Sequence, residues 1–71
     1  MTWDEERLLK VEKLIDKIFK SESRICLDRE FVFQKLADAG CSRSKIRDDM
    51  QMLVDQEKFL FYDSYLKKLN N

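Results

Sequence analysis

The groups best suited to bind an anionic partner are three cations within five positions, Arg43, Lys45 and Arg47. Arginine and lysine side chains reach phosphate oxygens and the acceptor atoms of guanine. Two polar side chains in the same stretch, Ser44 and Gln51, can form hydrogen bonds with bases. This combination of residues is typical of a helix that enters the major groove of duplex DNA.

Acids in the same stretch oppose a polyanion. Residues 42–58 carry four basic side chains and four acidic ones, Asp48, Asp49, Asp55 and Glu57. Carboxylates in a DNA groove are repelled by phosphate and must point away or accept from cytosine. The three cations are therefore equally consistent with an ordinary solvated helix start.

Residues for catalysis are scarce. The chain has no histidine to serve as a base for serine or cysteine, and with a single glycine it has no glycine-rich phosphate loop. Cys26 and Cys41 lie fifteen positions apart, which fits no metal-ligand spacing, so we interpret them as unpaired, slowly reacting core residues. We expect a protein without enzymatic activity, metal or cofactor.

The elements that must position the cations meet at a corner around Gly40, the only glycine. One helical pattern stops there and another begins two residues later. Glycine takes the positive φ that closes a helix at little cost, and Ser42 can cap the next helix by accepting from its first free N–H groups. The sequence predicts a helix-turn-helix.

Three helices are expected. Thr2 and Glu5 form a capping box for a helix over residues 3–20, and Asp28 caps a second helix from Arg29 to about Ala39. A third helix follows Gly40. The residues expected to face the core from these three helices are Leu8, Val11, Ile15, Ile18, Phe19, Val32, Phe33, Leu36, Ile46, Met50, Leu53 and Val54.

The C-terminal stretch favours short strands. Residues 59–69 are rich in aromatics and predict two β segments around a turn at Asp63 and Ser64, although a two-residue hairpin normally prefers glycine. Residues 24–27 form an apolar step too short for a helix. A fourth helix over the C-terminal stretch remains an alternative, because Tyr62, Tyr65, Leu66 and Leu69 also have helical spacing.

The leucine and glycine before the corner, the basic helix after it and the aromatic hairpin that follows resemble the winged helix-turn-helix superfamily. The resemblance implies a mainly α fold of three helices plus a short two- or three-stranded wing, as one domain over residues 1–71. It also implies a module that binds double-stranded DNA and regulates transcription or replication. The DNA-binding residues would be Arg43, Ser44, Lys45, Arg47, Gln51, Lys67 and Lys68.

Apolar residues beyond the core stripe support a second function, in which the same fold docks onto a protein partner or a second copy and does not bind DNA. Trp3, Leu9 and Leu14 widen the apolar face of the first helix, and Phe31 lies at the flank of the second. The first three are either covered by the loop and the C-terminal hairpin or form a contact surface, and Phe31 either reaches over to a neighbouring helix at the edge of the core or joins that surface.

Composition bounds these expectations. The 71 residues include fourteen basic and fourteen acidic side chains, so the formal net charge is zero and gives no general support for a polyanion partner. No apolar run approaches membrane-spanning length, and the start of the chain lacks a basic and an apolar region of a signal peptide. We expect a protein of the cytoplasm, or of the nucleus in a eukaryote, with reduced thiols.

Overall fold

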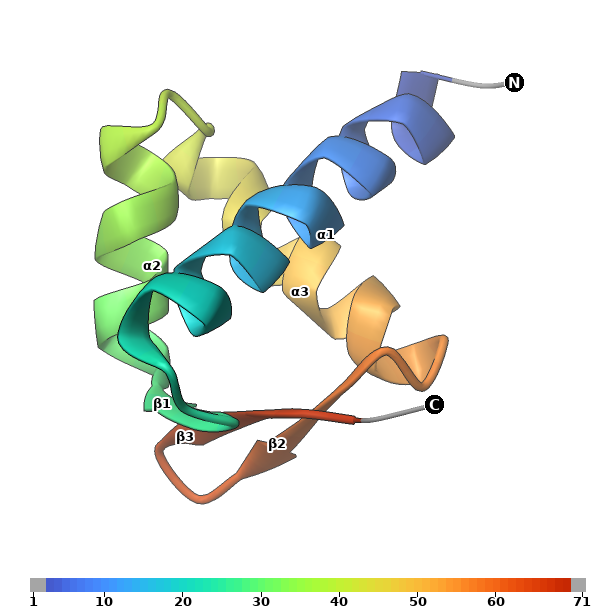
Figure 1. The fold of residues 1–71 in the computed structure, drawn as a ribbon. Coiled ribbons are helices and arrows are strands. Elements are labelled where there is room, and N and C mark those ends of the chain that lie inside the picture. Colours follow the sequence, from blue (N-terminus) through green and yellow to red (C-terminus); the bar gives the residue numbers. More distant parts are fainter. Residues whose placement is uncertain (1–2, 70–71) are drawn as a thin grey trace.

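The computed structural model describes residues 3–69, with the side chains described from Glu5 onward. Thr2 lies outside the described residues, and so does the predicted capping box. The first helix extends two residues beyond the predicted end. In chain order the elements are α1 (Trp3–Glu22), β1 (Cys26–Asp28), α2 (Arg29–Asp38), α3 (Arg43–Asp55), β2 (Phe59–Tyr62) and β3 (Tyr65–Lys68) (Figure 1).

The three strands form an antiparallel sheet in the order β1-β3-β2. Leu27 of β1 pairs with Leu66 of β3, and Tyr62 pairs with Tyr65 across the hairpin turn. The predicted hairpin is therefore confirmed, the apolar step over residues 24–27 contributes to β1, and the alternative of a fourth helix is wrong. Asp63 takes the positive φ, 53°, that glycine would normally supply in so short a turn.

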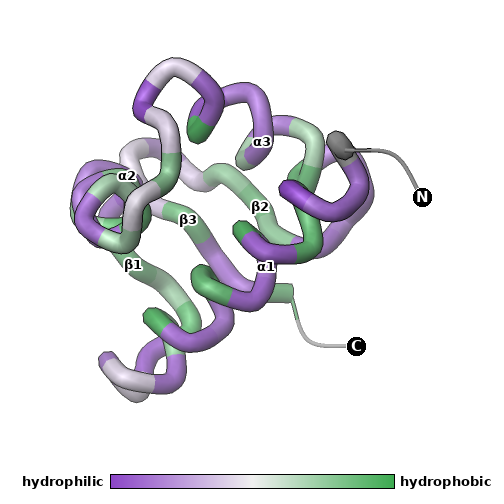
Figure 2. Tube along the Cα trace, turned by 90° about the horizontal axis from the view of Figure 1, so that it is seen from above, coloured by the Kyte–Doolittle hydropathy of each residue, from purple (hydrophilic) through white to green (hydrophobic). Residues whose placement is uncertain are grey.

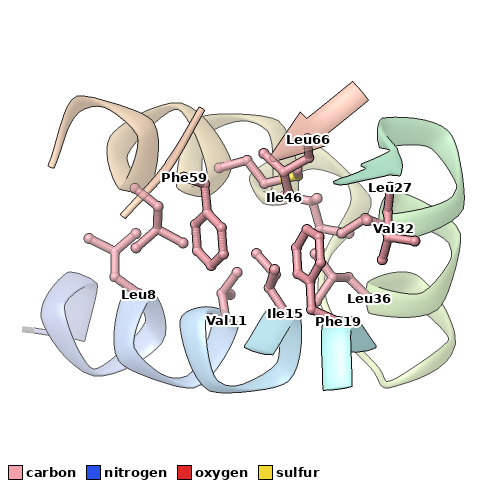
Figure 3. Packing of buried hydrophobic residues seen from close by; sticks show 12 residues of the cluster. Leu8, Val11, Ile15, Phe19, Leu27, Val32, Leu36, Ile46, Phe59 and Leu66 are labelled. Carbon is pink, nitrogen blue, oxygen red and sulfur yellow. The ribbon is translucent and has the colours of Figure 1, made fainter. Parts of the chain in front are cut away.

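The helices cover one face of this sheet (Figure 1), and the core lies between them. Figure 2 shows hydrophobic and hydrophilic residues alternating along α1, as in an amphipathic helix. Most residues predicted to face inward are buried, whereas Ile18, Phe33 and Val54 are only partly buried and lie at the edge of the core. The core residues are Leu8, Val11, Ile15, Phe19, Leu27, Val32, Leu36, Ile46, Met50, Leu53, Phe59 and Leu66 (Figure 3).

The corner between α2 and α3 forms as predicted. Gly40 has φ of +98°, its N–H donates to the carbonyl of Ala37, and the Cys41 N–H donates to the carbonyl of Leu36. This pair of hydrogen bonds is the Schellman ending of a helix, which requires a positive φ at the glycine. The corner therefore sets the direction in which α3 leaves α2.

The two predicted caps differ in outcome. The Asp28 carboxylate accepts from the N–H of Glu30 at 2.9 Å, which confirms the cap of α2. Ser42 has the extended backbone of an N-cap residue, but its side chain makes no capping hydrogen bond. Its Oγ lies 2.9 Å from the Oγ of Ser44, so the predicted side-chain cap of α3 is wrong. The hydroxyls bond to each other instead of to the helix backbone.

Cys26 and Cys41 are unpaired, as predicted, but both are half-buried rather than enclosed in the core. Over residues 3–69, no helix combines the length and the apolar character needed to cross a membrane.

Candidate nucleic-acid interface

A groove runs between α2, α3 and the hairpin. Its lining residues come from all three elements because the backbone N–H of Arg29 donates to the carbonyl of Ser64 at 2.9 Å, which ties the start of α2 to the hairpin turn. The groove continues into a second hollow that shares Glu30, Phe33 and Arg47. Together the two are lined by Arg29, Glu30, Phe33, Arg43, Ile46, Arg47, Gln51, Phe61 and Ser64, and we call this surface the arginine groove.

Two guanidinium groups in the arginine groove lie over aromatic rings. The Cζ atom of Arg29 is 4.9 Å from the centre of the Phe61 ring, and that of Arg47 is 5.6 Å from the Phe33 ring. A cation over the face of a ring is attracted by the ring quadrupole, and its N–H groups remain free to donate outward. Stacking therefore holds these two charges in place at the groove wall.

The exposed face of α3 is divided by charge. Ser44, Asp48, Gln51 and Asp55 follow one another at helical spacing and are all exposed. The amide nitrogen of Gln51 donates to Asp55 Oδ1 at 3.0 Å. The centre of this face therefore carries two carboxylates, and an amide already bonded to one of them, where the sequence predicted base contacts.

The predicted cations do not gather on one surface. Arg43 and Arg47 are one turn apart and both line the arginine groove. Lys45 is two positions from each of them, so it projects from the other flank of α3. The structure thus brings together Arg43, Arg47 and Gln51 and leaves Lys45 outside the groove.

The two lysines of β3 also lie elsewhere. The Nζ atom of Lys68 is 3.5 Å from Asp16 Oδ1, so this side chain reaches toward α1. Lys67 is exposed and alternates with the buried Leu66, which places it on the face of the sheet that turns away from the helices. Neither lysine lines the arginine groove.

Sequence patterns missed Arg29, Phe61 and Ser64 as site residues. Arg29 follows an N-cap and Phe61 lies in a strand, 32 positions apart, and only the pairing of the hairpin with β1 brings them together. Local periodicity carries no signal for such a contact. The contact between Arg29 and Phe61 could have been predicted only if the pairing of β1 with β3 had been known.

Asp49, one of the four acids expected to oppose a polyanion, is not on the surface. It is 2% exposed, and the Arg7 guanidinium holds it from α1. Arg7 Nε donates to Oδ1 at 3.1 Å and to Oδ2 at 3.0 Å, and Nη2 donates to Oδ1 at 2.9 Å. Asp49 therefore does not oppose a polyanion at the surface, as its place among the four acids predicted, and the ion pair links α3 to α1.

The predicted docking residues do not form one surface: Leu9 and Leu14 line a shallow hollow on α1, whereas Phe31 lies on α2. Leu9 remains 43% exposed, so coverage by the loop or hairpin is wrong for this residue. Leu14 and Phe31 are half-buried, and the Nζ atom of Lys35 lies 5.5 Å from the centre of the Phe31 ring. The side chain of Trp3 lies outside the described ones.

Within the described part of the chain, no three histidine, cysteine, aspartate or glutamate side chains lie together as metal ligands would. Comparison with protein-family models, with curated proteins and with solved structures gives no match.

Proposed function

We propose that this chain is a small DNA-binding module of the winged helix-turn-helix type that binds duplex DNA through the arginine groove. The observation that carries the proposal is the alignment of Arg29, Arg43 and Arg47 along one groove between α3 and the hairpin. The element order and the β1-β3-β2 sheet are compatible with the resemblance. Regulation of transcription or replication is the role that this resemblance implies.

In this proposal the arginines bind phosphates more than they select bases. Interactions with phosphate fix the position of a protein on DNA but carry no sequence information. Asp48 and Asp55 lie at the centre of the exposed α3 face. Their carboxylates oppose deep entry of α3 into the major groove of DNA unless they accept hydrogen bonds from cytosine amino groups. A single module of this size would bind weakly, so we expect tight binding to need two copies or a larger assembly.

The test compares two triple variants with the same change in net charge. Arg29→Ala, Arg43→Ala and Arg47→Ala together should weaken binding to a labelled duplex. They should also make the slope of log affinity against log salt shallower by about 0.9 for each phosphate that the protein no longer neutralises. The matched control changes three exposed α1 lysines, Lys10, Lys13 and Lys17, to alanine and should bind as the wild type does.

Fluorescence anisotropy at two salt concentrations measures both. Equal losses of affinity in the two triple variants would mean that total charge, rather than the groove, governs binding. A wild type that shows no duplex binding even at low salt, where phosphate contacts are strongest, would contradict the proposal. Circular dichroism confirms that each variant is folded.

Protein docking without DNA binding is the second candidate. The specific observation in its favour is that α3 exposes Asp48 and Asp55 where a DNA-binding helix would present cations, while Leu9 on α1 remains exposed to solvent. If the wild type does not bind duplex, this candidate becomes the leading one.

A further inference from the structure

A second groove runs between α1 and α2. Its floor is apolar, since Leu14 and Ile18 pack against the core with one side open to solvent. The groove is lined by Leu14, Lys17, Ile18, Ser21, Lys35 and Ala39, with Glu22 at one end, and we call it the α1–α2 groove. Through Leu14 and Lys17 it continues over α1 to a shallow hollow that includes Leu9, Lys10 and Lys13.

The two grooves use different sides of α2. Lys35 and Ala39 line the α1–α2 groove, whereas Arg29 and Phe33 line the arginine groove. Phe33 and Lys35 are two positions apart, and residues at that spacing point to different sides of a helix. A partner in the α1–α2 groove would therefore leave the arginine groove open.

Charge around the α1–α2 groove and its continuation is positive, although the whole chain is neutral. Four exposed lysines, Lys10, Lys13, Lys17 and Lys35, surround the apolar floor, against two exposed acids, Glu6 and Glu22. Within residues 3–69 none of these four lysines forms an ion pair. The Nζ atom of Lys35 lies 5.5 Å from the centre of the Phe31 ring, a contact that leaves its N–H groups able to donate, so all four ammonium groups can pair with acidic groups of a partner.

We propose that the α1–α2 groove binds an acidic amphipathic helix of a partner protein. Leu14 and Ile18 are one helical turn apart, so they match two apolar side chains spaced by one turn on the partner. Ala39 is small and leaves room for one of them. Lysine stems cover apolar surface while their ammonium groups pair with carboxylates at the rim.

A helix of this kind satisfies both features of the groove. A nucleic acid would use the lysines but leave Leu14 and Ile18 exposed, because phosphates offer no apolar surface. The proposal gives the docking candidate a surface and a partner chemistry, and it does not require DNA binding.

The probe is a fluorescein-labelled peptide of about 18 residues with leucines at i, i+4, i+7 and i+11 and glutamates beside them. Anisotropy should show saturable binding to the wild type. Lys17→Glu with Lys35→Glu should weaken it by about tenfold or more, since both charges at the rim are reversed. The matched control, Lys58→Glu with Lys67→Glu, reverses two exposed lysines outside both grooves and should bind the peptide as the wild type does.

A second probe separates docking from simple charge attraction. The same peptide with its leucines replaced by serine should bind at least about tenfold more weakly, because the apolar floor is then unused. Ile18→Glu should have a similar effect, and its circular dichroism melt shows whether the domain remains folded. If Ile18→Glu unfolds, the serine peptide still decides the question.

Three results would overturn the proposal: no peptide binding to the wild type, equal binding of the leucine and serine peptides, or equal losses of affinity in the two charge-reversal variants. Concentration-dependent mass in sedimentation, with loss of self-association in Lys17→Glu, would assign the groove to a second copy instead. Duplex binding is measured on the same samples. A loss of peptide binding with duplex binding intact, or the reverse, separates failure of this proposal from failure of DNA binding.

Discussion

The arginine groove and the α1–α2 groove hold their cations in different ways. In the first, Arg29 and Arg47 lie over the rings of Phe61 and Phe33. In the second, three of the four lysines, Lys10, Lys13 and Lys17, extend from one exposed helix face with no ion-pair partner in the described chain, and only Lys35 lies near a ring, that of Phe31. A stacked guanidinium has lost much of its rotamer freedom before a ligand arrives, whereas a free lysine loses it on binding.

This difference matters for the kind of ligand each groove suits. Phosphates of a duplex occur at fixed spacing, so charges held in place bind them at a lower entropic cost. Carboxylates on a partner helix vary in position, and flexible lysines can follow them. The comparison also shows why a net charge of zero says little about function, because basic side chains outnumber acidic ones in both grooves.

The largest expected effect is a loss of stability when the ion pair between Arg7 of α1 and Asp49 of α3 is broken. Arg7→Met leaves the carboxylate of Asp49, 2% exposed, without its guanidinium. Removing one partner of a buried ion pair costs about 3–5 kcal/mol of unfolding free energy. We expect the lower end of that range, because the Arg7 side chain is itself 33% exposed. Urea unfolding measures the loss.

The reciprocal change serves as the control. Asp49→Ala removes the buried charge and leaves an arginine that can turn toward water, so it should cost less than Arg7→Met. If the two variants lose equal stability, the cost is not that of a stranded buried carboxylate. Reduced duplex binding in both, at temperatures where they are folded, would show that the pair also positions α3.

The next largest effect is expected for Gly40→Val, which should lower the free energy of unfolding by more than about 1 kcal/mol. A Cβ at this position meets no atom within 4 Å, so the cost arises from the positive φ of +98° and not from a clash. Gly40→Asn is the matched variant, because asparagine tolerates positive φ better than a β-branched residue. Thermal melts compare them. Equal melting temperatures for wild type and Gly40→Val would contradict a strained corner.

Sequence patterns predicted the fold closely because its signals are local. Gly40, the Asp28 cap and the aromatic strands each act within a few residues, and the structure confirms all three. The candidate groove was predicted only in part. Arg43 and Arg47 belong to one helix and were among the predicted residues, whereas Arg29 reaches the same groove through a sheet contact that local spacing does not encode.

Asp49 is a second example of a contact that local patterns do not predict. It is adjacent to Asp48 in the sequence, but helical spacing separates the two: Asp49 lies three positions after Ile46 and four before Leu53, whereas Asp48 lies on the opposite face. Its partner, Arg7, is 42 positions away. Local spacing therefore places Asp49 beside the buried face of α3, but only the packing of α1 against α3 identifies the side chain that pairs with it.

The smallest expected effect tests whether stacking matters to the arginine groove. Phe61→Leu keeps a large apolar side chain at the sheet edge but removes the ring beneath Arg29. Cation–π contacts at partly exposed sites contribute about 0.5–1 kcal/mol, so duplex affinity should fall by about two- to fivefold.

The matched control is Phe31→Leu, which removes the ring near Lys35 and should leave duplex binding unchanged. Anisotropy at low salt resolves a change of this size, and thermal melts check that both variants are equally stable. If the two variants bind duplex alike, the held arginines offer no advantage over free cations, and the contrast between the two grooves reduces to their shape and charge.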